Sequence, residues 1–212
     1  MIRPPTLFTV LALLLTISAD VGAHHVGAYV PRDNAVSANF KQIKFAMQER
    51  KFAVALTLYS AGALRRELTK KSATLPPSLD ASIRNALEAG DAPTAETGLM
   101  IFFAALVRDL ALDADRRVAD PETPPSVRVA GGGKILEAIW RYYNLVDFSV
   151  SQRDPKAATA VRLAFEEAEA QVKASTPAPE RMRPPLNTIA RVLAGVIEAS
   201  SRPTSAGGVR GG

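Results

Sequence analysis

Residues 94–119 read TAETGLMIFFAALVRDLALDADRRVA, and Pro93 stands just before them. A proline is typical of the first turn of a helix, where its missing N–H is not needed. Apolar side chains then recur at helical spacing, and they cover two sides of the stretch: Leu99, Phe102, Phe103, Leu106 and Leu110 on one, Ile101 and Ala105 on the other. Such a wide apolar surface predicts a long helix in the middle of a bundle.

The sequence on both sides of this helix favours more helices. Ala, Leu, Glu, Arg and Lys dominate, and alternating runs of β-branched residues are missing. We therefore expect an all-α, single-domain bundle of five to seven helices over residues 37–200. The other helices are expected at 37–71 (two helices if a tight turn forms around Glu49–Lys51), 79–89, 133–153, 156–174 and 185–200.

Several residues mark the expected helix ends. Ser37 is a plausible N-cap, Gly90 fits a C-terminal stop, and Asp154-Pro155 gives an N-cap followed by a first-turn proline. Residues 120–125 (DPETPP) predict a rigid loop. Gly131-Gly132-Gly133 predicts a flexible hinge or hairpin turn; Lys134 follows, but the flanking residues do not fit a phosphate-binding P-loop.

Three turns share one feature, an alanine four residues further on. They are Arg50-Lys51 with Ala55, Gly90-Asp91 with Ala95, and Arg153-Asp154 with Ala158. The small residue would let each new helix pack closely on the previous one. This resembles the helical hairpins of tetratricopeptide repeats, most of all in ERKFAVALTLY (49–59). Because the turns are not evenly spaced, stacked helical hairpins stay an alternative to a simple bundle.

The N-terminus has the pattern of an export signal. Arg3 is followed by the 11-residue apolar run Leu7–Ile17, and Val21-Gly22-Ala23 offers small residues for a signal peptidase. We predict a signal peptide over residues 1–23, cut after Ala23, and a mature chain in the periplasm or outside the cell. An uncleaved anchor is the alternative. Residues 24–36 are expected to form an extended arm, and the Gly-rich residues 201–212 a disordered tail.

Composition excludes several kinds of site. Among 212 residues there is no cysteine, so disulfides, thiolate zinc sites, iron–sulfur clusters and covalent c-type haem are excluded. The only histidines, His24 and His25, are adjacent, which excludes a catalytic triad with a histidine from the fold interior. The net charge of +5 comes from scattered basic residues. Export argues against a nucleic-acid partner and favours a periplasmic or membrane-complex protein, with an anionic membrane face as another option.

The histidine pair is the strongest candidate metal site. Cleavage after Ala23 makes His24 the first residue, and its free α-amino group and imidazole can both bind a metal. His25 or an incoming partner would supply another nitrogen, which suits copper, with iron as the alternative. Two histidines at a solvated chain end are the structural alternative, and cleavage after Ala19 would leave both internal.

A second candidate lies in the helix expected at 133–153. Trp140, Tyr143 and Asp147 fall on one otherwise apolar face. A half-buried carboxylate beside two aromatic side chains predicts either a ligand site or a hydrogen bond that fixes the register of the helix. Asp109, Asp113 and Asp115 form an acidic group, but Arg116 and Arg117 follow at helical spacing and indicate an ordinary ion-paired face.

These patterns contain no nucleophile–base pair, and we expect no enzymatic activity. The sequence predicts an exported accessory or binding protein that captures a metal ion or a small ligand. The alternative is a helical scaffold or adaptor that docks onto a partner protein or membrane complex. The sequence does not fix the oligomeric state.

Overall fold

The computed structural model describes residues 32–202. This part of the chain contains eight α-helices and one 3-10 helix, and no β-strand. In order they are α1 (Ala35–Gln48), α2 (Phe52–Ala61), α3 (Ala63–Lys70), η1 (Ser72–Thr74), α4 (Leu79–Ala89), α5 (Ala92–Ala119), α6 (Pro125–Arg153), α7 (Pro155–Lys173) and α8 (Pro179–Ser201). The predicted all-α bundle is confirmed. The helix number exceeds the expected five to seven because residues 37–71 divide into three helices.

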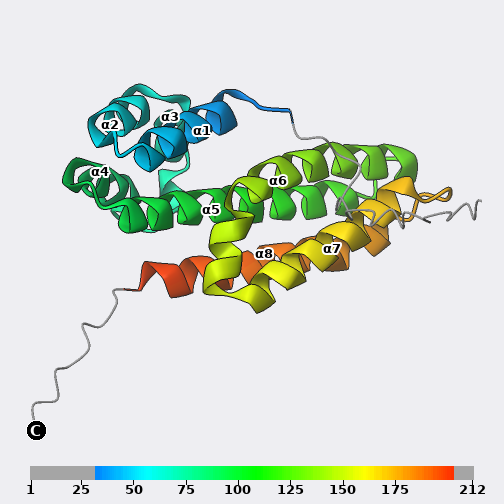
Figure 1. The fold of residues 1–212 in the computed structure, drawn as a ribbon. Helices are drawn as coiled ribbons and strands as arrows, with labels where there is room; N and C mark the ends of the chain where they lie inside the picture. Colours follow the sequence, from blue (N-terminus) through cyan, green and yellow to red (C-terminus); the bar gives the residue numbers. More distant parts are fainter. Residues whose placement is uncertain (1–31, 203–212) are drawn as a thin grey trace, which may run out of the picture.

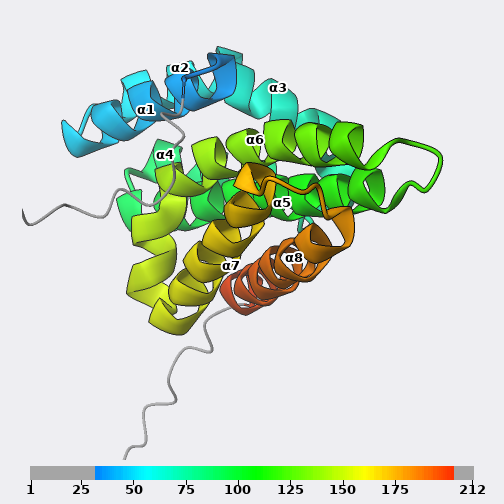
Figure 2. The same cartoon turned by 90° about the vertical axis from the view of Figure 1, so that its right-hand side faces the viewer.

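The last four helices form a four-helix bundle. Helix α5 runs through the middle of the molecule, with α6 on one side and α7 and α8 on the other (Figure 1). The most extensive contacts join α5 to α8 and α6, followed by α7 with α8 and α6 with α7. Figure 2 shows α7 and α8 side by side below α5 and α6. One face of α7 is buried here, with Ala158, Val161, Phe165 and Ala168 in the core and Val172 partly buried.

The first four helices gather at the N-terminal half of α5 (Figure 1). Helix α4 packs along α5 in a hairpin, and α2 packs on α4. Gly98 makes the close approach of α4 and α5 possible: a Cβ atom there would lie 2.4 Å from Cγ1 of Ile83. One hydrophobic core runs through both groups of helices, so α5 belongs to both.

The three turns with a following alanine have the predicted hairpin geometry. Ala55, Ala95 and Ala158 are almost completely buried, and each donates its N–H to the residue that caps its helix, at 3.0 Å. The turns before α2 and α5 also share their backbone conformation. Arg50 has φ 56° and Gly90, at the same position, has φ 70°. The next residue in each turn donates its N–H at 2.8 Å, Lys51 to the carbonyl of Ala46 and Asp91 to that of Ala86. The left-handed conformation costs a non-glycine residue such as Arg50 free energy.

Helix α1 begins earlier than the sequence indicates. Asn34, not Ser37, is the N-cap, so Ala35 and Val36 are helical rather than part of an extended arm. Ser37 occupies the third helical position. The Asn34 side chain accepts from the Ser37 N–H at 3.0 Å, and the Ser37 hydroxyl accepts from the Asn34 N–H at 2.9 Å. This reciprocal pair is a capping box with serine in the place usually taken by an acidic residue or glutamine.

The three glycines at 131–133 are not a hinge or turn, and that prediction was wrong. They lie inside α6, which begins at Pro125 rather than near Gly133. Gly132 and Gly133 are buried, and a Cβ atom at Gly132 would lie 2.9 Å from Val118 of α5 and 3.0 Å from Met182 of α8. Glycine therefore serves helix packing at this place.

Helix α8 also begins earlier than expected, at Pro179 instead of Pro185. Pro184 and Pro185 lie inside it, and Met182 and Pro185 are buried. Pro179 provides the first-turn proline of this helix, six residues before the expected start. Residues 1–31 and 203–212 lie outside the described part, and with them the predicted signal peptide, most of the arm and nearly all of the tail. No helix within residues 32–202 is long and apolar enough to cross a membrane.

Candidate functional site

Two neighbouring cavities flank the first turns of α5 and the end of α6. The first is also lined by residues of α4 and the end of α8, and the second by residues of α1. The first has a volume of about 430 Å³ and the second about 480 Å³. Pro93, Thr97 and Arg153 line both cavities, so we treat the two as one cleft and call it the Arg153 cleft. A volume of this size suits a small molecule.

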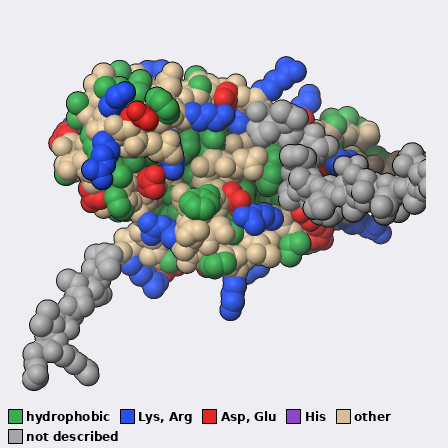
Figure 3. Space-filling model, in the orientation of Figure 1, with side chains coloured by type: hydrophobic (Ala, Val, Ile, Leu, Met, Phe, Trp, Pro, Cys, Tyr) green, Lys and Arg blue, Asp and Glu red, His purple; other side chains and the backbone are tan. Residues whose placement is uncertain are grey.

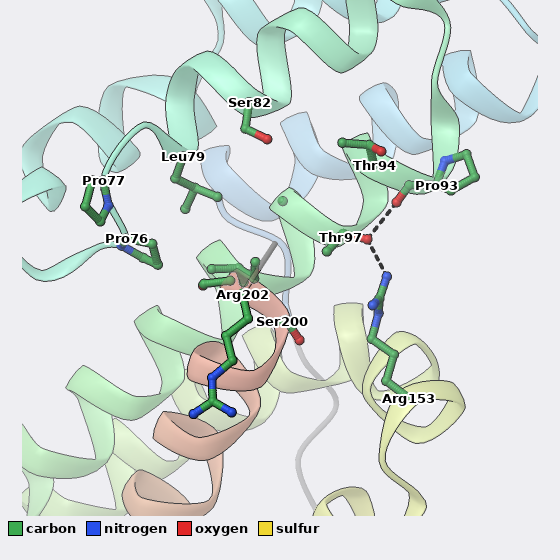
Figure 4. A pocket seen from close by; sticks show the side chains of 13 residues that line it. Pro76, Pro77, Leu79, Ser82, Pro93, Thr94, Thr97, Arg153, Ser200 and Arg202 are labelled. Atoms are coloured by element: carbon green, nitrogen blue, oxygen red, sulfur yellow. Dashed lines mark hydrogen bonds between the residues drawn. The ribbon is translucent and has the colours of Figure 1, made fainter. Parts of the chain in front are cut away.

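Arg153 is the central charged side chain of the cleft. It is the last residue of α6, and its guanidinium donates from Nη2 to the Thr97 hydroxyl on α5 (Figure 4). That hydroxyl in turn donates to the carbonyl of Pro93 at 2.7 Å. Within residues 32–202, no carboxylate lies within ion-pair distance of Arg153. Thr97 therefore engages one end of the guanidinium, and its other donors have no carboxylate partner in the described part of the chain.

The second cavity combines a charged pair with an exposed aromatic ring. Lys44 of α1 and Glu96 of α5 form an ion pair of 3.0 Å in its wall. Phe148 of α6 is 74% exposed, which is high for a phenylalanine, and it lines the same cavity. Gln48, Ser149 and Gln152 supply neutral polar groups.

The first cavity is lined by prolines and hydroxyl groups. Pro76 and Pro77 precede α4, while Ser82, Thr94 and Ser200 come from three different helices (Figure 4). Arg202 also lines it, but its guanidinium points along α8 and pairs with Glu198. Arg202 is thus neutralised, in contrast to Arg153.

The aromatic candidate predicted from the sequence lies elsewhere, and none of its members lines either cavity. Trp140 stacks on Phe165 of α7 at 4.4 Å between ring centroids, and Tyr143 is completely buried. Burial, and then the nearby charge of Asp147, raise the pKa of the Tyr143 hydroxyl. Asp147 accepts two hydrogen bonds from Arg162.

The acidic group on α5 has basic partners, and for Asp113 these are the two arginines that its spacing indicates. Asp113 pairs with Arg116 at 3.3 Å and with Arg117 at 3.0 Å. Asp109 contacts Arg108, Lys71 and Thr74, and Asp115 pairs with Arg183. On the face seen in Figure 3, basic and acidic side chains are interspersed.

The predicted metal ligands His24 and His25 lie outside the described residues. Between residues 32 and 202, no three histidine, aspartate or glutamate side chains lie together in a way that would hold a metal ion. The metal site at the N-terminus therefore stays a prediction.

Sequence reasoning missed the Arg153 cleft. Arg153 stood out only as part of the turn before α7, and Thr97 only as a helical residue. The two residues are 56 positions apart, and their contact depends on how α6 packs on α5. The one local signal was Phe148, an aromatic residue that falls outside the buried apolar face of its helix.

The fold and the cleft define an all-helical protein with a small-molecule-sized cleft between its helical hairpins and its four-helix bundle. No protein-family model matches the chain, and neither a curated protein nor a solved structure is significantly similar to it.

Proposed function

We propose that the protein is exported and acts as a non-enzymatic binding protein that takes a small ligand into the Arg153 cleft. The observation that carries this proposal is the guanidinium of Arg153, held by Thr97 between two cavities and without a carboxylate partner in residues 32–202. Preorganised polar groups in a mostly preformed cleft are typical of small-molecule sites. The leader pattern of residues 1–23 supports export.

Four carboxyl groups have partners that stabilise the charged form. The pKa values of Asp33, Asp80, Asp91 and Asp120 lie below the usual value. Each has a structural cause: hydrogen bonds come first in every case, from Lys41, Arg65, Thr94 and Thr123 respectively. These carboxylates stabilise the fold.

A thermal-shift screen tests the proposed function. The mature protein is heated with single compounds from four classes: metal cations, sugars, amino acids and organic anions. A ligand of the cleft raises the midpoint of unfolding, because it binds only the folded state. Thr97→Val and Phe148→Ser, which alter the cleft walls, reduce this shift. If no class stabilises the protein, or if both variants respond like the wild type, the proposed function is wrong.

A scaffold or adaptor is the second candidate function, and exposed apolar side chains favour it. Phe45 on α1 is 63% exposed and Leu163 on α7 is 60% exposed. Such side chains are typical contact points for a partner protein of the cell envelope. A Phe45→Ser, Leu163→Ser double variant should then lose association with envelope fractions, whereas Arg153→Ala should keep it. Equal association of the wild type, the double variant and Arg153→Ala would count against the scaffold function.

The histidine pair at the predicted mature N-terminus adds a separate candidate site for copper or iron. It does not depend on the cleft, and it is tested by a different experiment below.

A further inference from the structure

We infer that the ligand of the Arg153 cleft is an organic anion whose carboxylate binds Arg153 and whose apolar body packs on Phe148. This inference rests on the proposed function and specifies its ligand class. It starts from two features that line the same cavity, one cationic and one apolar.

The charge balance of the cleft favours an anion. A guanidinium has five N–H donors, and the structure assigns one group of Arg153, Nη2, to a neutral hydroxyl. The carboxylate in the cavity wall, Glu96, is paired with Lys44. Asp154, which follows Arg153 in the chain, accepts from the Ala157 N–H at 2.9 Å, and Asp91, two residues before Pro93, accepts from the Thr94 N–H at 3.1 Å. The guanidinium of Arg153 is exposed and has no carboxylate partner within residues 32–202, so it is open to an anionic ligand.

The geometry of a guanidinium favours a carboxylate. Its planar fork donates two parallel hydrogen bonds to the two oxygens, and such charge-assisted pairs are about twice as strong as neutral ones. Thr97 fixes the orientation of the fork through Nη2, which lowers the cost of ordering it when a ligand binds.

The apolar part of the cavity favours an organic body over a bare inorganic anion. Phe148 offers an aromatic ring that is mostly exposed, and Pro93 lines the same cavity. Covering this ring removes apolar surface from water. Ions such as phosphate or acetate would use Arg153 but would leave Phe148 uncovered.

Calorimetric titration of the mature protein with benzoate, benzamide and acetate tests the inference. Benzoate carries both features, benzamide lacks the charge, and acetate lacks the ring. We expect benzoate to bind more tightly than either, and Arg153→Ala to weaken benzoate binding by about tenfold to one-hundredfold, the usual effect of losing hydrogen bonds to a charged group. Arg153→Lys keeps the positive charge but not the two parallel donors, and it should weaken benzoate binding less than Arg153→Ala does. Phe148→Ser should weaken benzoate and benzamide alike.

Arg116→Ala is the matched control, because Arg116 is an exposed arginine of α5 outside both cavities and should leave binding unchanged. Circular dichroism and the unfolding midpoint confirm that each variant is folded. Equal affinity for benzoate and benzamide, or unchanged benzoate binding by Arg153→Ala, overturns the anion inference but leaves a binding protein. Failure of every compound class in the thermal-shift screen overturns the proposed function itself.

Discussion

The carboxylate of Asp147 on α6 accepts two hydrogen bonds from the guanidinium of Arg162 on α7, Nε to Oδ1 at 3.0 Å and Nη2 to Oδ2 at 2.6 Å. The two residues face each other across the α6–α7 hairpin. Arg162 thus donates hydrogen bonds to both carboxylate oxygens of Asp147, beside the buried ring of Tyr143. The hydrogen bond to Asp147 is also the main reason that the pKa of Arg162 is raised.

Arg162→Ala should lower the free energy of unfolding by about 1–2 kcal/mol, because it leaves a partly buried carboxylate without its charged partner. Urea unfolding measures the effect. Arg117→Ala is the control: Arg117 pairs with Asp113 on the surface with 65% of its side chain exposed, and its loss should cost less than about 0.5 kcal/mol. Equal effects of the two substitutions would show that the Asp147–Arg162 pair has no special structural role.

Arg50→Gly should stabilise the protein by about 1 kcal/mol, because Arg50 has φ 56° and a left-handed conformation costs a non-glycine residue about 1–2 kcal/mol. Gly90 occupies the same position in the α4–α5 turn. Thermal unfolding checks the change. Arg66→Gly, at an exposed position inside α3, should instead destabilise by about 1 kcal/mol. A lower midpoint for Arg50→Gly would contradict the equivalence of the two turns.

Gly131→Ala and Gly98→Ala should act in opposite directions. A Cβ atom at Gly131 meets no atom within 4 Å, so alanine should add about 0.5–1 kcal/mol of helix stability. At Gly98 the same atom would lie 2.4 Å from Ile83, and overpacking should cost about 1–3 kcal/mol. Chemical denaturation of both variants gives the comparison. Destabilisation by Gly131→Ala would indicate that residues 131–133 are not helical.

Acid should destabilise the protein partly through Asp80. Hydrogen bonds from Arg65, and a smaller contribution from Tyr59, hold the pKa of this carboxyl below its usual value of about 4. Because the folded state has the lower pKa, the stabilisation is fully present above about pH 4 and is lost as the pH falls further. In Asp80→Asn, the free energy of unfolding should therefore decrease less steeply below pH 4 than in the wild type. Tyr59→Phe, which keeps Arg65, should retain most of that fall.

The N-terminal histidines give a prediction outside the described residues. The mass of the mature protein should correspond to a chain that begins at His24, and copper should bind it with one equivalent. His24→Ala and His25→Ala should each weaken copper binding in a titration. Equal weak binding by all three proteins, or a chain that begins at Asp20, would count against the metal site.

Local sequence signals were sufficient for much of the fold. The apolar surface of residues 94–119 placed α5 in the core, and Asp154-Pro155 located the start of α7, where Asp154 does accept from the Ala157 N–H. Signals that depend on tertiary packing were misread. Gly132 resembles a turn residue until Val118 and Met182 are packed against it. The cleft was not predictable for the same reason, since the contact of Arg153 with Thr97 joins two helices.

The continuity of α5 has a consequence for ligand capture. Pro93, Thr97 and Ile101 of this helix line the cleft, and the same helix packs against α4 and against α6 and α8 of the four-helix bundle. No flexible linker separates the two halves of the described molecule, because a single uninterrupted helix, α5, belongs to both. If the cleft binds a ligand as proposed, we expect selectivity to come from the shape and charge of the preformed cleft rather than from closure of one lobe over the other.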